Sequence, residues 1–189
     1  MAVLRFPPNE LRIEDESAIR ENLAPYGIGF ERWTLDRVPV DASAEQVLTA
    51  YSGEIAAMKQ RGGYVTADVI DVHPETPNLE VMLARFDKEH THAEDEVRFI
   101  LSGQGIFFLA LGEKVAAAEV GPGDMLCVPR GTRHWFTLCE DRRIRAIRWF
   151  QDPAGWAPLY TGSGIDRGYD PVCFGPAYLG PRATAKITL

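Results

Sequence analysis

The hydrophobic and polar positions of this chain follow three patterns along its length. Up to about residue 87, helical and strand-like periods are mixed, whereas residues 88–150 hold short apolar runs separated by turn residues. From residue 151 onward the chain is rich in Gly, Pro and Tyr and has little periodicity. We expect one domain over residues 1–189, with a mixed part (1–87), a barrel core (88–150) and a wrapping C-terminal segment (151–189).

The first part begins with a short predicted helix. The stretch SAIRENLAPYG indicates a helix with Ser17 as its N-cap, and Pro25 and Gly27 end it. The stretch FERWTLDRV then alternates like a strand.

A longer helix is expected from Ser43 to about Gln60. Ser43 and Gln46 have the spacing of a capping box, and Arg61-Gly62-Gly63 favours an end to the helix. The stretch PNLEVMLARFDKE also has helical spacing and leads to His90. The apolar stripe of the longer helix consists of Val47, Leu48, Tyr51, Ile55 and Met58.

The middle part predicts antiparallel β-structure. Many short strands at near-regular spacing are typical of a mainly β sandwich or barrel. The expected strands are Glu89–His92, Val97–Leu101, Gly105–Leu111, Val115–Val120, Met125–Pro129, His134–Cys139 and Ile144–Phe150.

Composition limits the expected partners and cellular location of the protein. The net charge is −7 and Lys and Arg form no cluster, so neither nucleic acid nor an anionic membrane is an expected partner. No apolar run approaches the length of a membrane span. The cysteines, Cys127, Cys139 and Cys173, are odd in number and form no C-x-x-C motif. We expect a soluble cytoplasmic monomer without a disulfide framework, in which Cys127 is inert packing.

Three of the four histidines belong to two motifs. His90 and His92 lie two apart on a predicted strand, so both imidazoles share a face, and Glu96 opens the next strand after a turn at 93–95. His134 opens a later strand, behind the turn formed by Pro129 and Gly131. An isolated H-x-H in an acidic loop is more often a solvated surface feature. The second motif favours convergence of three imidazoles and one carboxylate on a divalent transition metal.

These residues resemble the two motifs of the cupin superfamily. G-x5-H-x-H-x3,4-E-x6-G matches at His90, His92, Glu96 and Gly103, and G-x5-P-x-G-x2-H-x3-N matches up to His134. Ala84 replaces the leading glycine and Leu138 the final asparagine, and neither position holds a ligand. The resemblance implies a cupin barrel (a double-stranded β-helix or jelly roll) with a few peripheral N-terminal helices.

A narrower resemblance covers about residues 75–160. The string EHTHAEDEVRF, followed by GEKV and VPRGTRHWF, is similar to the acireductone dioxygenase family of methionine salvage. The resemblance implies cleavage of the acireductone 1,2-dihydroxy-3-keto-5-methylthiopentene with O2. Iron enzymes of the family yield formate and a 2-oxo acid, 4-methylthio-2-oxobutanoate. Nickel enzymes yield formate, CO and 3-methylthiopropanoate.

The residues also fit that chemistry on their own. Four protein ligands leave two positions on an octahedral metal, enough for an enediolate, and the ligand set suits Fe(II), Ni(II), Co(II) and Mn(II) alike. Arg98 follows Glu96 by two residues and is expected to point into the same cavity. It either anchors the anionic substrate, which we favour, or pairs with Glu94, Asp95 or Glu96.

Aromatic residues are candidates for the pocket walls. Phe136 shares the inward face of His134, and Phe86 precedes His90 by four residues, although plain core packing is the commoner fate of phenylalanine. The resemblance assigns Phe86 and Phe136 to the walls and Trp156 to the methylthio tail. His73 has no partner motif and is expected to be structural or exposed.

Two other functions remain open. A metal-dependent sugar-phosphate isomerase would need basic residues for a phosphate, which the acidic EDE run and a lone Arg98 fit poorly. A non-catalytic binding cupin would have no need of all four ligands.

Overall fold

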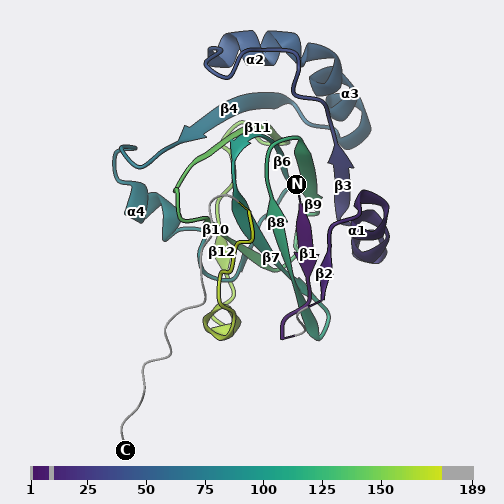
Figure 1. Ribbon diagram of the computed structural model, residues 1–189, viewed down its shortest axis with the longest axis vertical. Coiled ribbons are helices and arrows are strands. Elements are labelled where there is room, and N and C mark those ends of the chain that lie inside the picture. Colours follow the sequence, from purple (N-terminus) through teal and green to yellow (C-terminus); the bar gives the residue numbers. More distant parts are fainter. Residues whose placement is uncertain (1, 9–10, 176–189) are drawn as a thin grey trace, which may run out of the picture.

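A computed structural model describes residues 2–8 and 11–175 of the chain. Two antiparallel sheets face each other, and no described strand belongs to both, so hydrogen bonds do not close the sandwich into a barrel. The predicted mainly β fold is confirmed, with open edges. In spatial order one sheet contains β12 (Leu159–Tyr160), β5 (His90–Thr91), β10 (His134–Leu138), β7 (Gly105–Leu111), β8 (Lys114–Val120), β1 (Val3–Arg5) and β2 (Arg12–Ile13). The other contains β3 (Gly29–Arg32), β9 (Asp124–Val128), β6 (Glu96–Gly103), β11 (Ile144–Phe150) and β4 (Thr66–Val72) (Figure 1).

The strand period of two divides each sheet into an inner and an outer face. On β6, Val97 and Phe99 join the core cluster of the outer layer, whereas Ile100 joins the cluster between the sheets. On β10, Phe136 belongs to the inner cluster and Trp135 to the cluster on the outer face. Glu96 and Arg98 lie on the same face of β6 as Ile100, and His134 lies on the same face of β10 as Phe136. All three side chains therefore face the space between the sheets.

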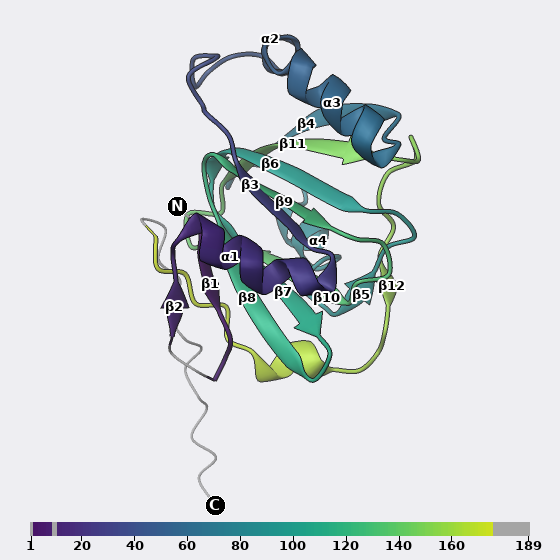
Figure 2. The ribbon, with the colours of Figure 1, turned by 90° about the vertical axis from the view of Figure 1, so that its right-hand side faces the viewer.

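Two helices cover the outer face of the five-stranded sheet, α2 (Ala44–Ala50) and α3 (Ser52–Gly62) (Figure 2). The predicted capping box is present: the Ser43 side chain accepts from Gln46 N, and the Gln46 side chain accepts from Ser43 N. The single helix expected here is wrong, because the chain leaves helical geometry at Tyr51, whose hydroxyl donates to Thr34 O at 2.9 Å. That contact ties the tyrosine to the segment after β3, and its ring packs against Phe99 of β6. Gly63, in the left-handed conformation, ends α3 as expected.

A further helix, α1 (Glu16–Leu23), packs beside β3. Its N-cap is Asp15 rather than the predicted Ser17, since the Asp15 carboxylate accepts from Ala18 N at 2.9 Å. The helix is followed by η1 (Ala24–Tyr26), and Gly27 in the left-handed conformation ends this segment.

In the N-terminal part, several further elements differ from those predicted from the sequence. The strand predicted from FERWTLDRV ends at Arg32, and α4 (Leu79–Leu83) is shorter than the predicted helix. Three strands of this part, β1, β2 and β4, were not predicted, and neither was β12 in the C-terminal segment. The β4 sequence, TADVIDV, mixes polar and apolar residues on both faces, because one of its faces contributes to a cavity and the other packs under the helices. All seven strands predicted within residues 88–150 are present, two of them with the predicted bounds.

Beyond β12, the described part of the C-terminal segment packs on the outer face of the seven-stranded sheet. Ile165, in η2 (Ile165–Gly168), and Tyr169 pack against a cluster that includes Phe108 and Trp135. Cys139 and Cys173 form a disulfide, which the odd number of cysteines had argued against, and Cys127 is the free thiol. The remainder of the predicted wrapping segment, 176–189, lies outside the described residues. Within the part of the chain that the structure describes, no helix is long and apolar enough to cross a membrane.

Candidate metal centre

Four predicted ligands meet between the two sheets. His90 on β5 is the cross-strand partner of His134 on β10, which agrees with the expected convergence of the histidines. His92 follows β5 directly, and Glu96 is the first residue of β6. The expectation that Glu96 opens a strand beside His90 is wrong in one respect, because β5 and β6 belong to different sheets. The carboxylate therefore faces the imidazoles across the sandwich.

The four side chains are close together and removed from solvent. One candidate ligand atom from each lies within 4.8 Å of all the others. Glu96 Oε2 is 3.0 Å from His92 Nε2 and 3.1 Å from His134 Nε2. None of the four residues is more than 3% exposed. A solvated surface role for His90 and His92 is thereby excluded.

Backbone carbonyls orient all three imidazoles. The Nδ1 atoms of His90, His92 and His134 lie 2.7, 3.0 and 2.8 Å from the carbonyl oxygens of Lys88, Ala157 and Thr132. A carbonyl can only accept, so each Nδ1 carries the proton and each Nε2 presents a lone pair.

Those lone pairs converge on the Glu96 carboxylate in a buried space. Acceptor atoms facing one another at about 3 Å repel each other unless a proton or a cation lies among them. His90 Nε2 has no hydrogen-bond partner among the described residues. The arrangement, with each outer nitrogen held by a carbonyl, fits a bound metal ion.

Protonation states agree with that fit. Burial, followed by the proximity of His134, lowers the pKa of His90 to about 4, so its imidazole is neutral near pH 7. Burial raises the pKa of Glu96, but the Arg98 guanidinium, together with His134 and His92, lowers it well below its usual range. Neutral imidazoles with one carboxylate form a donor set for divalent first-row metals.

The turn between His92 and Glu96 is held by its own acidic residues. Glu94 Oε2 accepts from the backbone N–H groups of Gln151 and Asp152 at 2.5 and 2.8 Å. Asp95 Oδ1 accepts from Arg130 N at 2.9 Å, and Asp95 O accepts from Trp156 Nε1 at 3.1 Å. Glu94 and Asp95, two of the expected alternative partners of Arg98, therefore fix the loops around the centre.

Arg98 pairs with a predicted ligand and also faces the aromatic residues. Its Nε lies 2.7 Å from Glu96 Oε1 in a buried ion pair. Its guanidinium carbon lies 4.8 Å from the ring centre of Phe136 and 5.2 Å from that of Trp156. Both roles considered for Arg98 from the sequence are thus compatible with its position.

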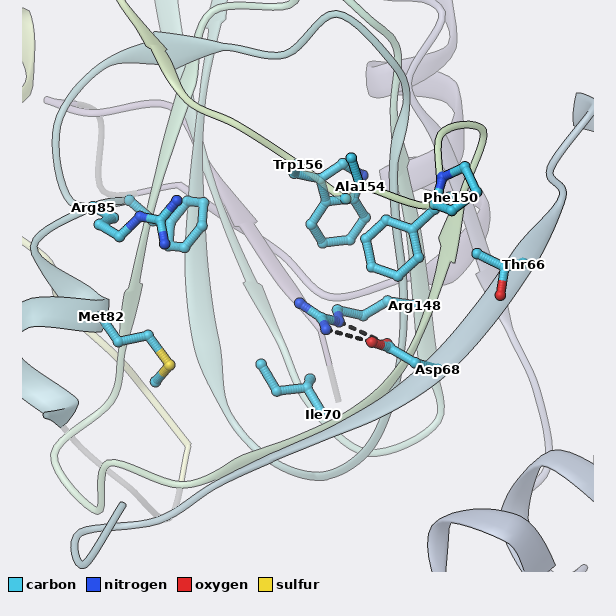
Figure 3. Close-up of a pocket in the computed structure, with 12 residues that line it drawn as sticks. Thr66, Asp68, Ile70, Met82, Arg85, Arg148, Phe150, Ala154 and Trp156 are labelled. Atoms are coloured by element: carbon cyan, nitrogen blue, oxygen red, sulfur yellow. Dashed lines mark hydrogen bonds and ion pairs between the residues drawn. The ribbon is translucent and has the colours of Figure 1, made fainter. Parts of the chain in front are cut away.

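A cavity of about 470 Å³ opens beside the centre (Figure 3). Phe86 and Trp156 line it, and the ring of Phe86 is 5.7 Å from His90 while that of Trp156 is 6.1 Å from His92. A smaller hollow is lined by Arg98 and Phe136. The two hollows share Ile70, Met82, Phe86 and Arg148 in their walls. All predicted site residues thus surround one region.

Three charged wall residues, Asp68, Arg85 and Arg148, were missed by the sequence analysis. Arg148 donates to both carboxylate oxygens of Asp68, at 2.9 and 2.6 Å, and Figure 3 shows this pair beside Phe150. A signal was present in the strand IRAIRWF, where the period of two places Arg148 on the face of Ile144 and Ala146. His73, by contrast, is exposed beside Glu75, as expected.

Two facing antiparallel sheets around a buried cluster of three histidines and a glutamate define a metal-binding cupin. The sequence profile of the ARD/ARD' family matches residues 8–158, and the chain belongs to this family. The resemblance found in the motifs is thereby confirmed.

Several proteins that match most of this chain are named acireductone dioxygenase. One from Marinobacter nauticus is 40% identical over 153 residues, covering 81% of this chain and 83% of its own. One from Synechococcus is 42% identical over 159 residues, covering 84% and 86%. The solved structure of acireductone dioxygenase from Bacillus anthracis, with a cadmium ion in its active centre, is 38% identical. It superposes with a TM-score of 0.80 over 85% of this chain and 98% of its own.

Proposed function

We propose that this chain is an acireductone dioxygenase that cleaves 1,2-dihydroxy-3-keto-5-methylthiopentene with O2 in methionine salvage. The observation that carries the proposal is the buried set of three Nε2 lone pairs facing one carboxylate. Family membership supports the same activity, and relatives named for it match more than four fifths of the chain.

His90, His92, Glu96 and His134 would hold one divalent metal. The cadmium ion of the Bacillus anthracis enzyme supports a divalent ion at this position. When bound, such a metal supplies a Lewis acid and a template for two neighbouring oxygens of the substrate. The carbonyls that hold each Nδ1 keep the imidazoles in the tautomer that binds metals.

The identity of the metal decides the products. We propose Fe(II) or Ni(II), with Co(II) and Mn(II) as ions that the same donor set would accept. With iron the products are formate and 4-methylthio-2-oxobutanoate. With nickel they are formate, CO and 3-methylthiopropanoate.

Arg98 and the aromatic residues bind the substrate in this proposal. The Arg98 guanidinium keeps its charge and offers further N–H donors beyond the Nε that faces Glu96, so it can hold an anionic oxygen. Phe86, Phe136 and Trp156 exclude water from the reacting carbons. The apolar methylthio tail fits against Trp156 and the wall formed by Ile70 and Met82.

One structural feature favours the isomerase alternative: two basic residues, Arg85 and Arg148, also line the cavity. However, Arg148 is neutralised by its bidentate pair with Asp68, so of these two arginines only Arg85 would serve a phosphate. The acireductone therefore remains the better fit.

The decisive experiment begins with metal analysis of protein from its native host. Protein loaded separately with Fe(II) and Ni(II) is then given the acireductone under air, and O2 uptake and products are measured. Formate with the 2-oxo acid supports iron chemistry, and formate with CO supports nickel chemistry. Binding of the acireductone without O2 uptake in either form would contradict the proposal and favour a non-catalytic cupin.

A further inference from the structure

We propose that the Tyr64 hydroxyl, acting through Asp95, positions the substrate-facing side of the metal centre. Tyr64 itself touches neither the ligands nor the cavity, so it is a positioning residue. The effect on substrate binding rests on the function proposed above, whereas the effect on Trp156 does not.

Tyr64 lies just beyond α3, in the apolar layer between the helices and the five-stranded sheet. The residue is 5% exposed, and its hydroxyl donates to Asp95 Oδ2 at 3.1 Å. The Cys127 Sγ atom lies 3.7 Å from the same hydroxyl. Burial, followed by the nearby Cys127 and Asp95, raises the pKa of Tyr64. The hydroxyl therefore keeps its proton and acts as a donor to the carboxylate.

Asp95 joins three segments that build the site. It sits in the turn between two predicted ligands, His92 and Glu96. Its Oδ1 accepts from Arg130 N in the turn that leads to His134, and its carbonyl accepts from the Trp156 indole. One residue thus connects the ligand turn, the approach to β10 and the aromatic wall.

The Tyr64 hydroxyl fixes the second carboxylate oxygen of this junction. Asp95 is only partly buried, so a carboxylate oxygen that loses the Tyr64 hydroxyl must move or take up water in its place. Movement of Asp95 would carry its backbone carbonyl, and with it the Trp156 ring that lines the cavity. The carbonyls of Lys88 and Thr132 still hold His90 and His134, and only His92 is held by a carbonyl, that of Ala157, beside Trp156. We therefore expect the metal to stay bound.

The chain offers a matched control in Tyr51. This residue belongs to the same apolar layer and is also buried, and its hydroxyl donates to Thr34 O, away from the metal centre. Tyr64→Phe and Tyr51→Phe each delete one buried hydroxyl. For Tyr64→Phe we expect KM for the acireductone to rise about five- to tenfold, with kcat within about twofold and unchanged metal content. For Tyr51→Phe we expect the parent kinetics.

A second readout needs neither metal nor turnover. The fluorescence of Trp156 is isolated as the difference between each metal-free protein and the same protein carrying Trp156→Phe. Acrylamide should quench this component more strongly in Tyr64→Phe than in the parent or in Tyr51→Phe. In Asp95→Asn, the further change Tyr64→Phe should have a smaller effect on KM than it has in the parent.

Parent quenching and parent KM in Tyr64→Phe would overturn the proposal, as would equal effects in Tyr51→Phe, which indicate general loosening of the helical layer. If the parent protein shows no O2 uptake, the proposed function fails, and the quenching comparison still decides the role of Tyr64.

Discussion

Glu96 and Arg98 lie two residues apart on β6 and form an ion pair, 2.7 Å between Oε1 and Nε, inside the sandwich. The other carboxylate oxygen of Glu96 faces His92 and His134. One carboxylate thus connects the proposed metal to the proposed substrate anchor. The position of Arg98 depends on Glu96, while its guanidinium remains beside Phe136 and Trp156.

Replacement of Arg98 should impair turnover more than metal binding. A hydrogen bond to a charged group contributes about 1.5–3 kcal/mol. We therefore expect kcat/KM of metal-loaded Arg98→Ala to fall by about one to two decades. Metal content, measured by elemental analysis, should stay at the parent level because four ligands remain.

Arg98→Lys is the matched variant for charge. Lysine keeps the charge but loses the planar fork, so it should recover only part of the lost kcat/KM. Normal kinetics in an Arg98→Ala protein that unfolds readily would show that Arg98 only balances the buried Glu96, and the anchor would then lie elsewhere.

The proposed ligands should couple metal content to stability. A metal bound by β5, β6 and β10 joins both sheets, and an ion that binds only the native state stabilises it. His134→Ala should therefore lose metal and show a lower Tm than the metal-loaded parent. The control is His73→Ala, which changes an exposed histidine outside the centre. Stoichiometric metal in purified His134→Ala would refute the ligand assignment.

Trimming the aromatic walls separates substrate binding from core packing. Phe136 is 5% exposed and packs on Phe107, so Phe136→Ala should cost about 3–5 kcal/mol in the free energy of unfolding. If Phe136 also lines the substrate pocket, the folded Phe136→Ala protein with stoichiometric metal should show a raised KM or a lowered kcat. Phe86, less buried and lining the cavity, should show the kinetic change with a smaller loss of stability. Kinetics of the parent type in both variants would leave them as core residues.

The pH dependence of the metal-free protein should report on His90. Its pKa is about 4 in the folded chain and about 6.5 unfolded, so the unfolded state binds more protons between these values. The contribution of His90 to stability should therefore fall as the pH drops from about 6.5 towards 4 and level off below that. Urea titrations across this range measure the slope. His90→Gln should flatten it, whereas His73→Gln should not, and an unchanged slope in His90→Gln would contradict the prediction.

The disulfide between Cys139 and Cys173 should stabilise the fold. It ties the C-terminal segment to the end of β10, the strand that carries His134. Its loss in Cys173→Ser should lower the free energy of unfolding by about 2–4 kcal/mol, and a dithiol should have the same effect on the parent. Cys127→Ser is the control with the disulfide intact. Three reactive thiols in the denatured, unreduced parent would show that the bond is absent in solution.

Much of the site could be predicted because strand periodicity is local. A spacing of two places His90 beside His92, and Glu96 beside Arg98, on one face whatever the rest of the chain does. The turn residues Pro129 and Gly131 likewise set the start of the strand that carries His134. Local rules of this kind also gave the seven strands of the middle part and the capping box at Ser43.

The missed features arise from contacts between distant segments. Asp68 and Arg148 are 80 residues apart, and their pairing follows from the register of β4 against β11. The roles of Glu94 and Asp95 depend on residues 130 and 151–156, which meet the ligand turn only in the folded chain. The break at Tyr51 and the disulfide at Cys139 have the same origin, since each depends on a partner brought near by packing.

The sequence by itself determined the ligand types, their faces and the family, because these depend on residue identity and short spacing. The tertiary structure alone decided that Glu96 approaches the histidines from the opposite sheet, and it decided which acidic residues hold the loops. It also determined that Arg98 would pair with Glu96 rather than with either neighbouring acid. The physical reason is that burial and pairing depend on which surfaces the fold brings into contact, and no local pattern of residues encodes that.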